Sequence, residues 1–378
     1  MAVLTEEQSM LKDQANAWAR DESPVTSFRQ FRNSGAENGY ADNTWAQIAA
    51  MGWTGILIPE ALGGSGMDHA TFGVVLEETG RQLVASPLLA SGLVGASALL
   101  LGGNETLSQQ WLPRIAAGSA IVTMAVDEGP HHAPEQLALA ATRSGDSFKL
   151  DGSKVFVLEG GSADAFVVAA RTSGTAGEQS GITLFLVPAD TAGISVSNLK
   201  TADSRGYADL RFNGVEIGAD AVLGEVDKCF ALLDALLDRA RAGLAAEMLG
   251  TACEAFDRTL EYLKTREQFG QVIGSFQSLG HRAATLFMDM EFARSCVEAA
   301  LRAIDADDPE TPILCSLAKC KAGEFLHDMS NDMIQMHGGI GMTDEFDAGF
   351  YLKRARATEA TFGGQSFHRR RYISHYGI

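Results

Sequence analysis

The longest amphipathic pattern in the chain runs from Phe230 to Leu263. Apolar residues recur at every third or fourth position, and charged residues occupy much of the opposite side. This is the period of a helix with one apolar face, and no proline interrupts it. At ~1.5 Å of rise per residue the helix is roughly 50 Å long, too long to cover one small core alone. The pattern therefore predicts a bundle of long helices.

The segment after this helix predicts a short connection to a second amphipathic helix. It reads Arg266-Glu267-Gln268-Phe269-Gly270 and then Ile273-Gly274-Ser275-Phe276-Gln277. Gly270 and Gly274 can supply the left-handed geometry of a helix end, and Ser275 is the candidate cap of the second helix. Taken one residue at a time, the segment fits an ordinary helix–helix connection.

Helical patterns also fill the chain before residue 118. Thr5-Glu6-Glu7-Gln8 is a capping-box sequence, and a short helix is expected to end at Gly52. Leu83–Leu101 carries no charge and approaches the length of a membrane span. Because it contains Pro87, three serines and two glycines, we expect a buried helix at a domain or subunit interface instead.

Between residues 119 and 226 the period changes from that of a helix to that of a strand. Runs rich in β-branched residues alternate with turn sequences such as Ser144-Gly145-Asp146 and Asp151-Gly152. This spacing is typical of an antiparallel sandwich or barrel. The predicted strands are Ile121–Val126, Leu137–Thr142, Phe148–Leu150, Lys154–Leu158, Ala165–Ala170, Ile182–Val187, Ile194–Val196 and Ala208–Phe212.

After residue 227 the chain is helical again. One helix is expected to end near His337-Gly338 and a shorter one to cover Asp347–Arg356, followed by the turn Phe362-Gly363-Gly364. The order of helices, strands and helices predicts an α+β fold. Its three domains are a helical one over 1–118, a β domain over 119–226 and a helical bundle over 227–378.

Composition narrows the classes of partner. The formal net charge of −18 argues against a nucleic-acid or anionic-membrane partner through bulk electrostatics. The five cysteines show no C-x-x-C spacing and are expected to be buried reduced thiols. His131-His132 has no further spaced ligands, so no metal site is predicted. The N-terminus lacks a basic region followed by an apolar core, and we expect a cytoplasmic protein.

Two long motifs carry a family resemblance. The first is R-x-x-F-G-x-x-I-x-x-F-Q from Arg266 to Gln277, and the second is Gln335-Met336-His337-Gly338-Gly339-Ile340-Gly341-Met342-Thr343. Together they resemble the acyl-CoA dehydrogenase family, and the resemblance covers essentially the whole chain. It implies FAD-dependent α,β-dehydrogenation of an acyl-CoA thioester. It also implies a tetramer held by the C-terminal four-helix domain, and electron transfer to an electron-transfer flavoprotein.

The resemblance assigns one set of residues to FAD. In the family this arginine and glutamine reach the FAD of a neighbouring subunit, where Arg266 can pair with the pyrophosphate and Gln277 and Gln335 can bond to the adenosine portion. The glycines allow close approach of the backbone. The implied FAD contacts are Arg266, Phe269, Gln277, Gln335, Met336, His337, Gly338, Gly339, Gly364 and Ser366.

The catalytic base of the family has no counterpart here. The reaction needs a carboxylate that removes the α proton while the flavin takes the β hydride. The family places its glutamate either in the turn that matches Thr361–Ser366, where Phe362 stands, or before an arginine that matches Arg241, where Ala240 stands. Arg241 is a candidate substrate-binding residue.

Four acids are candidates for a relocated base: Glu247, Glu359, Asp344 and Glu345. Glu247 lies six residues after Arg241, so it points well off the face of that arginine. The competing interpretation is the same for all four, a solvated or salt-bridged acid.

The first half of the flavin site is also altered. The family's strand end, a hydroxyl residue followed by Glu-Pro-Gly-Ala-Gly-Ser-Asp, here reads Val126-Asp127-Glu128-Gly129-Pro130-His131-His132-Ala133-Pro134. Its Trp-Ile-Thr reads Phe156-Val157-Leu158, and leucine cannot donate a side-chain hydrogen bond. Asp127 would place negative charge near a ring that must accept hydride.

This combination resembles the small or β-type subunits of bacterial heteromeric acyl-CoA dehydrogenases of steroid side-chain or pimeloyl-type breakdown. We therefore expect an accessory subunit in an α2β2 complex, sharing FAD with a catalytic partner. One alternative is a self-sufficient homotetramer with a relocated carboxylate. The other is a CoA-ester-binding or scaffold protein without flavin.

Overall fold

The computed structural model describes residues 4–36 and 38–377. They form two compact units. The helical unit holds Met1–Gln30, His69–Val84 and Arg241–Ile378, and the sheet unit holds Phe31–Asp68 and Ala85–Ala240. Each unit joins segments that lie far apart in the sequence, so neither coincides with a single predicted domain. The three domain boundaries stay a prediction.

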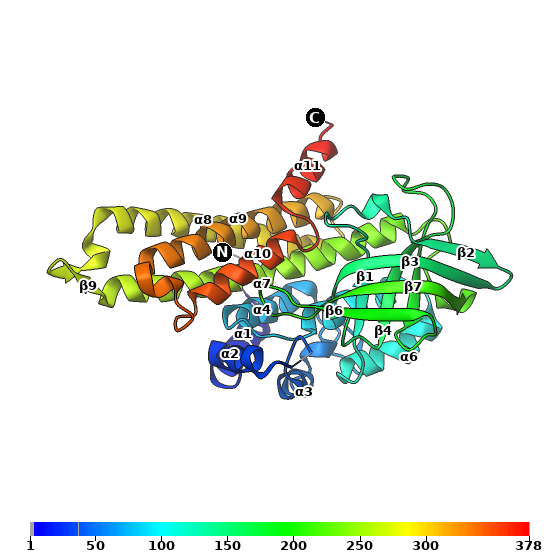
Figure 1. Cartoon of the computed structure of the whole chain (residues 1–378), viewed down its shortest axis with the longest axis horizontal. Helices are drawn as coiled ribbons and strands as arrows, with labels where there is room; N and C mark the ends of the chain where they lie inside the picture. Colours follow the sequence, from blue (N-terminus) through cyan, green and yellow to red (C-terminus); the bar gives the residue numbers. More distant parts are fainter. Residues whose placement is uncertain (1–3, 37, 378) are drawn as a thin grey trace. The chain divides into compact units, whose positions relative to one another are not determined.

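The helical unit is built on long helices. α7 (Phe230–Thr265) contributes its part from Arg241 onward, and α8 (Gln277–Asp305), α9 (Thr311–His337) and α10 (Ala348–Ala360) follow it. Figure 1 shows α7, α8 and α9 running alongside one another. The long helix predicted from Phe230 and the helix predicted to end near His337 are both confirmed.

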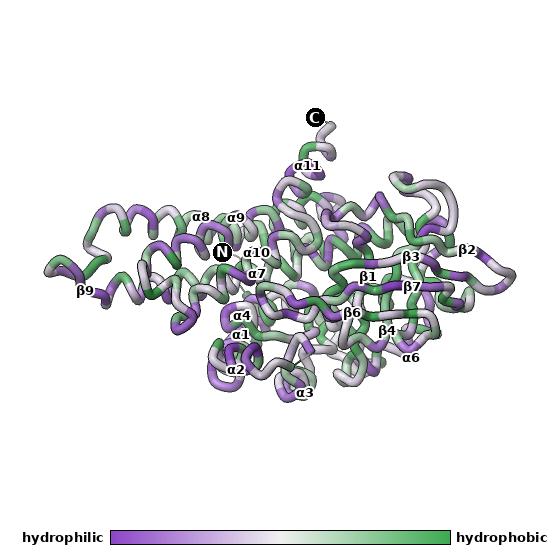
Figure 2. The backbone as a smooth tube through the Cα atoms, viewed as in Figure 1, coloured by the Kyte–Doolittle hydropathy of each residue, from purple (hydrophilic) through white to green (hydrophobic). Residues whose placement is uncertain are grey.

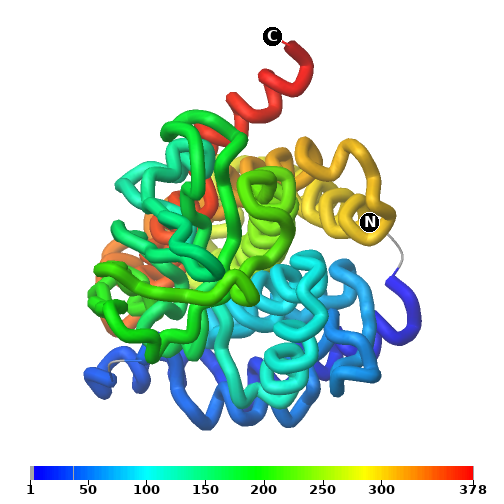
Figure 3. Tube along the Cα trace, turned by 90° about the vertical axis from the view of Figure 1, so that its right-hand side faces the viewer, coloured from blue at the N-terminus to red at the C-terminus, as the bar shows by residue number. Residues whose placement is uncertain are grey.

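Three further helices lie wholly within this unit. α1 (Glu6–Asp21) begins with the predicted capping box at Thr5, α4 (His69–Arg81) packs on α1, and α11 (Gln365–His375) packs on α9. Figures 1 and 3 show α11 projecting away from the other helices toward the C-terminus.

α4 and α7 approach each other closely because two glycines lie at the contact. A Cβ atom on Gly80 would lie 2.3 Å from the carbonyl oxygen of Glu247, and one on Gly250 would lie 1.8 Å from that of Glu77. No side chain fits at either position, so the glycines set the distance between the helices.

A short hairpin, β9 (Glu267–Gln268) and β10 (Gln271–Val272), connects α7 to α8. The 3-10 turn η6 (Ile273–Ser275) follows it. The prediction that Ser275 caps α8 is wrong, because α8 begins at Gln277 after Phe276 and the Ser275 hydroxyl donates to the carbonyl of Val272 at 2.6 Å.

The sheet unit contains one eight-stranded sheet in the order β6-β7-β3-β2-β4-β5-β8, with β1 beside β4. Most neighbours are antiparallel, as predicted, but β1 and β2 each pair with β4 in parallel. The strands are β1 (Val122–Ala125), β2 (Ala140–Ser144), β3 (Ser147–Leu158), β4 (Ala165–Arg171), β5 (Ile182–Pro188), β6 (Ile194–Leu199), β7 (Tyr207–Gly218) and β8 (Val222–Leu223).

Two predicted strands are in fact one. The segments 148–150 and 154–158 both belong to β3, because Asp151-Gly152 forms an irregularity in the pairing with β7 and not a turn. The core against the sheet includes Phe148 and Phe185, whose ring centroids are 5.1 Å apart.

Short helical segments cover the rest of the sheet unit. Leu83–Leu101, predicted as one buried helix, contains η3 (Leu88–Gly95), a π-helical segment, and α5 (Ala96–Leu101). Ala98 and Leu99 of α5 are buried, but Leu100 and Leu101 are exposed. The others are α3 (Asp42–Ala50), η1 (Trp53–Gly55), η2 (Glu60–Leu62), α6 (Glu105–Ala116), η4 (Pro134–Gln136) and η5 (Ala219–Ala221). The pattern did not predict α2 (Val25–Ser34), which buries only Val25 and Phe28.

Candidate functional site

The hairpin after α7 exposes the first group of predicted site residues. Arg266, Phe269 and Gln277 are all solvent-exposed, and the Phe269 side chain is 91% exposed. Phe269 has a backbone φ of 55° and meets Phe276 edge-on, with 6.2 Å between ring centroids. Figure 2 shows hydrophilic colour at β9. The hairpin therefore presents a cation, an amide and an aromatic ring to the solvent.

The end of α9 exposes the second group. Gln335 is exposed, whereas Met336 and His337 point into the helical unit and are buried. Gly338 has φ 64° and ψ −137°, and a Cβ atom on Gly338 or Gly339 would meet nothing within 4 Å. The backbone of this loop is thus open to close approach by a flat or charged group.

His337 is held between two aromatic rings. Its ring stacks on Tyr262 of α7 at 4.3 Å and contacts Phe346 at 4.5 Å between centroids. Its Nδ1 donates to the carbonyl of Met333 at 2.7 Å, and its Nε2 is buried without a hydrogen-bond partner. Burial lowers the pKa of His337. The neutral ring therefore anchors the loop to α7.

A second contact ties α8 to α9 near the same end. Arg282 donates to the carboxylate of Asp332 at 2.8 Å. Together with the Tyr262–His337 stack, it joins the ends of α7 and α9 and the start of α8. The structure thus gathers Arg266, Phe269, Gln277 and Gln335–Gly339 at one end of the helical unit.

Gly364 and Ser366 are not part of this group. They lie after the C-terminal end of α10, in the segment that leads into α11. Since α10 has 13 residues, roughly 20 Å of helix separates them from the loop before it. The predicted FAD contacts therefore fall into two separate places.

The turn that matches the family's base contains no acid. Phe362 has a φ of 57°, and Gly363 has one of 104°. Arg241 is fully buried, donates from Nε to the carbonyl of Phe362 at 3.4 Å, and lies 5.4 Å above the ring of Phe367. Ala240 is also fully buried. Neither predicted base position carries a proton acceptor.

Sequence analysis missed Lys319, a buried lysine beside this turn. Its ammonium donates to the carbonyls of Thr358, Glu359 and Gly363 at 2.9, 3.3 and 3.3 Å. Burial lowers the pKa of Lys319 to about 7. The only signal in the sequence is a lysine on the apolar face of α9, between Cys315 and Ala322.

The alternative acids are engaged in ion pairs. Glu247 Oε1 accepts from Arg354 at 3.0 Å and 2.6 Å, and both residues are buried. Glu359 pairs with His327 and Arg356, each at 3.0 Å. These contacts agree with the salt-bridged interpretation of these acids.

The other two acids lie in the loop before α10. Asp344 accepts from Arg29 at 3.4 Å. Glu345 is exposed to solvent. The contact of Asp344 also agrees with the salt-bridged interpretation, and the exposure of Glu345 agrees with the solvated one.

In the sheet unit, the segment that matches the family's flavin-binding turn is closed by its own side chains. Asp127 pairs with His132 at 2.8 Å, and Lys154 pairs with Glu128 at 2.7 Å. Glu128 also accepts the backbone N–H groups of Ala138 and Leu139 at 2.8 and 3.0 Å. Backbone donors that an anionic group would need are thus already used.

The neighbouring strand end does not fit a flavin ring either. Leu158 is buried and offers no side-chain donor. Phe156 has a φ of 51° and a largely exposed ring. This part of the chain therefore offers no side-chain donor at Leu158, whereas the loop after α9 leaves its backbone open at Gly338 and Gly339.

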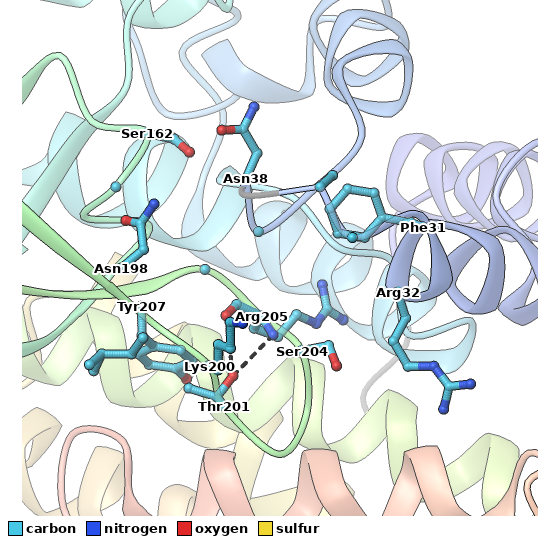
Figure 4. A pocket seen from close by; sticks show the side chains of 16 residues that line it. Phe31, Arg32, Asn38, Ser162, Asn198, Lys200, Thr201, Ser204, Arg205 and Tyr207 are labelled. Atoms are coloured by element: carbon cyan, nitrogen blue, oxygen red, sulfur yellow. Dashed lines mark hydrogen bonds between the residues drawn. The ribbon is translucent and has the colours of Figure 1, made fainter.

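A cavity of about 550 Å³ lies in the sheet unit, and none of the predicted site residues lines it. Figure 4 shows its labelled side chains, and the hydroxyl of Thr201 bonds to the backbone of Arg205 there. Its lining residues are Phe31, Arg32, Gly35, Ala36, Asn38, Gly39, Gly161, Ser162, Asn198, Leu199, Lys200, Thr201, Ser204, Arg205, Gly206 and Tyr207.

Residues 4–36 and 38–377 contain no group of three or more His, Cys, Asp or Glu residues able to hold a metal ion. Among the helices of the same residues, none combines the length and the apolar character of a membrane span. The five cysteines are free thiols, as predicted, and four of them are buried, but Cys296 is only partly buried.

Three family models match consecutive parts of the chain. The acyl-CoA dehydrogenase N-terminal domain matches residues 5–119, the middle domain 128–215 and the C-terminal domain 229–375. The chain belongs to the acyl-CoA dehydrogenase family. The predicted fold class, with helical, β and helical domains in that order, is thereby confirmed.

Individual members of the family cover nearly the whole chain. Probable acyl-CoA dehydrogenase fadE25 of Mycobacterium leprae (strain TN) is 31% identical over 337 residues, covering 87% of this chain and 86% of that protein. The ChsE4-ChsE5 complex from Mycobacterium tuberculosis matches with a TM-score of 0.90 at 28% identity, covering 100% of this chain and 99% of the other. The Tcur3481-Tcur3483 steroid ACAD G363A variant matches with a TM-score of 0.88 at 30% identity, covering 98% of each chain.

Family membership fixes the general chemistry. Acyl-CoA dehydrogenases are oxidoreductases that bind FAD and oxidise acyl-CoA thioesters. This family member lacks an acid at both of the positions where the base was predicted.

Proposed function

We propose that this chain is the accessory subunit of a heteromeric acyl-CoA dehydrogenase. A catalytic partner holds the base and the flavin ring. This chain binds the adenosine end of the same FAD molecule. The observation that carries the proposal is Phe362 and Ala240 at the two base positions, in a chain that keeps the exposed loops around Arg266 and Gln335.

Each residue of this adenosine-binding half-site has a proposed role. The Arg266 guanidinium pairs with the pyrophosphate in a charge-assisted hydrogen bond, and the amides of Gln277 and Gln335 bind the adenosine portion. Gly338 and Gly339 let the backbone approach the nucleotide. Bound FAD supplies the hydride acceptor of the reaction. Phe269, Met336 and His337 shape this half-site. Gly364 and Ser366 are further proposed FAD contacts beyond the C-terminal end of α10, and Arg241 is the proposed substrate-side residue.

An exposed apolar stripe on α8 supports association with a second chain. Phe287, Met288 and Phe292 of α8 are 51, 54 and 64% exposed. Met288 and Phe292 lie one turn apart, and Phe287 directly precedes Met288. Exposed apolar patches of this kind mark protein–protein contacts. The proposed assembly is an α2β2 heterotetramer in which each subunit type contributes its helical bundle.

The comparisons support a two-protein assembly. Both solved structures named above are described by two protein names, and one is called a steroid ACAD. We propose a CoA thioester of a steroid side chain or a dicarboxylic acid as substrate, and an electron-transfer flavoprotein as electron acceptor. The cytoplasm is the proposed location.

Two alternatives fit the structure less well. A self-sufficient homotetramer needs a relocated base, and the ion pairs of Glu247 and Glu359 disfavour both acids. A scaffold or CoA-ester-binding protein without flavin does not explain why the loop that matches the family's nucleotide contact is kept open.

Anaerobic flavin bleaching tests the proposal. The lone chain with added FAD is expected to leave the flavin oxidised in the presence of acyl-CoA thioesters. The complex with a co-expressed catalytic partner is expected to lose its flavin absorbance with one of them. Bleaching by the lone chain would support the homotetramer alternative and contradict the accessory role.

A further inference from the structure

Lys319 is a buried cation that the proposed function does not use. Its side chain is 2% exposed. Cys315, one turn before it in α9, and Ala322, one turn after it, are fully buried. Burying a lysine is costly unless its ammonium is hydrogen-bonded. Its position therefore calls for a structural or positioning role.

The ammonium replaces hydrogen bonds that α10 loses at its end. The carbonyls of the last helical turn have no intrahelical partner, and here the chain leaves the helix at Ala360. Lys319 donates to Thr358 and Glu359 of that turn and also to Gly363, beyond the helix. A cation at a helix C-terminus is also favoured by the helix dipole.

The bonded segment has an unusual backbone. Phe362 and Gly363 both have positive φ, at 57° and 104°, and a non-glycine residue in this region is strained. Arg241 holds the Phe362 carbonyl from α7, and Lys319 holds Gly363 from α9. Two buried cations on two helices thus hold successive carbonyls of one turn.

We propose that Lys319 is a positioning residue for the Phe362 turn, and that the turn keeps its shape only while the amine carries its third proton. An ammonium has three N–H groups for the three carbonyls, whereas a neutral amine has two and turns a lone pair toward the third. The proposal does not rest on the accessory role, since it holds for any function of residue 362.

Burial and the charges around the amine together set the pKa of Lys319. Glu359 of α10 and Cys320 of α9 favour the charged form, and Arg241 of α7 opposes it. From α11, the His368 ring lies 3.0 Å from where a Cβ on Gly363 would be. Burial is the largest influence and lowers the pKa of Lys319 to about 7. The turn should therefore be held below neutral pH and released above it.

A tryptophan at the turn reports its state. Phe362→Trp in the full chain is expected to change its emission between pH 6 and pH 9 with a midpoint near 7, after subtraction of the four native tryptophans. Adding Lys319→Met should abolish this transition and hold the emission at its high-pH value. Lys321→Met is the matched control, because Lys321 is exposed and pairs only locally with Glu324.

A flat emission profile in Phe362→Trp would overturn the proposal, and so would a transition that persists after Lys319→Met. Where Lys319→Met does not fold, Lys319→Arg decides the question. Arginine stays charged across this range, so its profile should be flat at the low-pH value, and a persisting transition would contradict the role of Lys319.

Discussion

The side chain at position 362 cannot act as a base, although two cationic side chains bind the backbone carbonyls around it. Arg241 and Lys319 bind the carbonyls of Phe362 and Gly363. A phenyl ring accepts no proton, and Ala240 is equally inert. The turn that resembles the family's base position is thus held by two cations but carries no carboxylate.

Phe362→Glu returns a carboxylate to this turn. We expect the lone chain to remain inactive, because the Asp127–His132 pair and Leu158 still alter the flavin-ring half. The measurement is flavin bleaching by acyl-CoA thioesters under anaerobic conditions. Robust turnover by this single variant would refute the argument that the chain has two separate defects.

Arg266 is the residue whose loss should weaken the FAD half-site most. Arg266→Ala removes a charge-assisted hydrogen bond worth about 1.5–3 kcal/mol, equivalent to a roughly 10- to 100-fold weaker Kd. FAD retained per complex after gel filtration measures the effect. Lys264→Ala, which removes an exposed cation at the same helix end, should retain FAD normally. Equal flavin content in both variants would remove the assignment.

The helices and most strands could be predicted from the sequence because their apolar periods are long and regular. α7 begins where its pattern begins, and β4 differs from its prediction by one residue. Local turn chemistry was less informative: Asp151-Gly152 continues β3, and Ser275 bonds backward to Val272. Of the candidate site, the sequence predicted only the residues of the two exposed motifs, because those motifs have a fixed spacing.

Contacts between distant segments could not be predicted. Lys319 meets residues about 40 positions away, and nothing in the local sequence marks its partners. The same holds for the Glu247–Arg354 ion pair and for the Tyr262–His337 stack. Such pairs depend on how α7, α9 and α10 pack, which periodicity does not specify.

The close contact between α4 and α7 gives a matched pair of substitutions. Gly250→Ala places a Cβ atom 1.8 Å from the carbonyl oxygen of Glu77, so we expect a loss of about 1–3 kcal/mol in the free energy of unfolding. Gly280→Ala in α8 meets nothing within 4 Å and should stabilise by about 0.5–1 kcal/mol. Urea denaturation of the lone chain measures both, and an unaffected Gly250→Ala would contradict the packing.

The aromatic stack around His337 predicts a pH dependence. Burial lowers the pKa of His337 in the folded state, so the unfolded chain binds its proton first as pH falls below about 6.5. Its contribution to stability is complete above that pH and is lost as pH falls through the lowered folded pKa. The change in urea midpoint between pH 7 and pH 5 should shrink in His337→Gln. An unchanged difference would exclude His337 as a titrating anchor.

In the proposed function, this chain and its partner subunit each contribute one half of the FAD site. This chain closes its own flavin-ring segment with the Asp127–His132 and Glu128–Lys154 pairs, yet it exposes Arg266, Gln277 and Gln335 at one end of the helical unit. The proposed association with a second protein accounts for both the exposed polar groups and the apolar stripe on α8. In the proposed complex, that protein brings the base, the ring site and the substrate thioester.

The most direct test is the visible spectrum and native mass of the chain, purified alone and after co-expression with a catalytic acyl-CoA dehydrogenase subunit. The account predicts a colourless lone chain and a yellow α2β2 complex with about one FAD per pair. A yellow homotetramer that reduces its own flavin with a CoA thioester would contradict it.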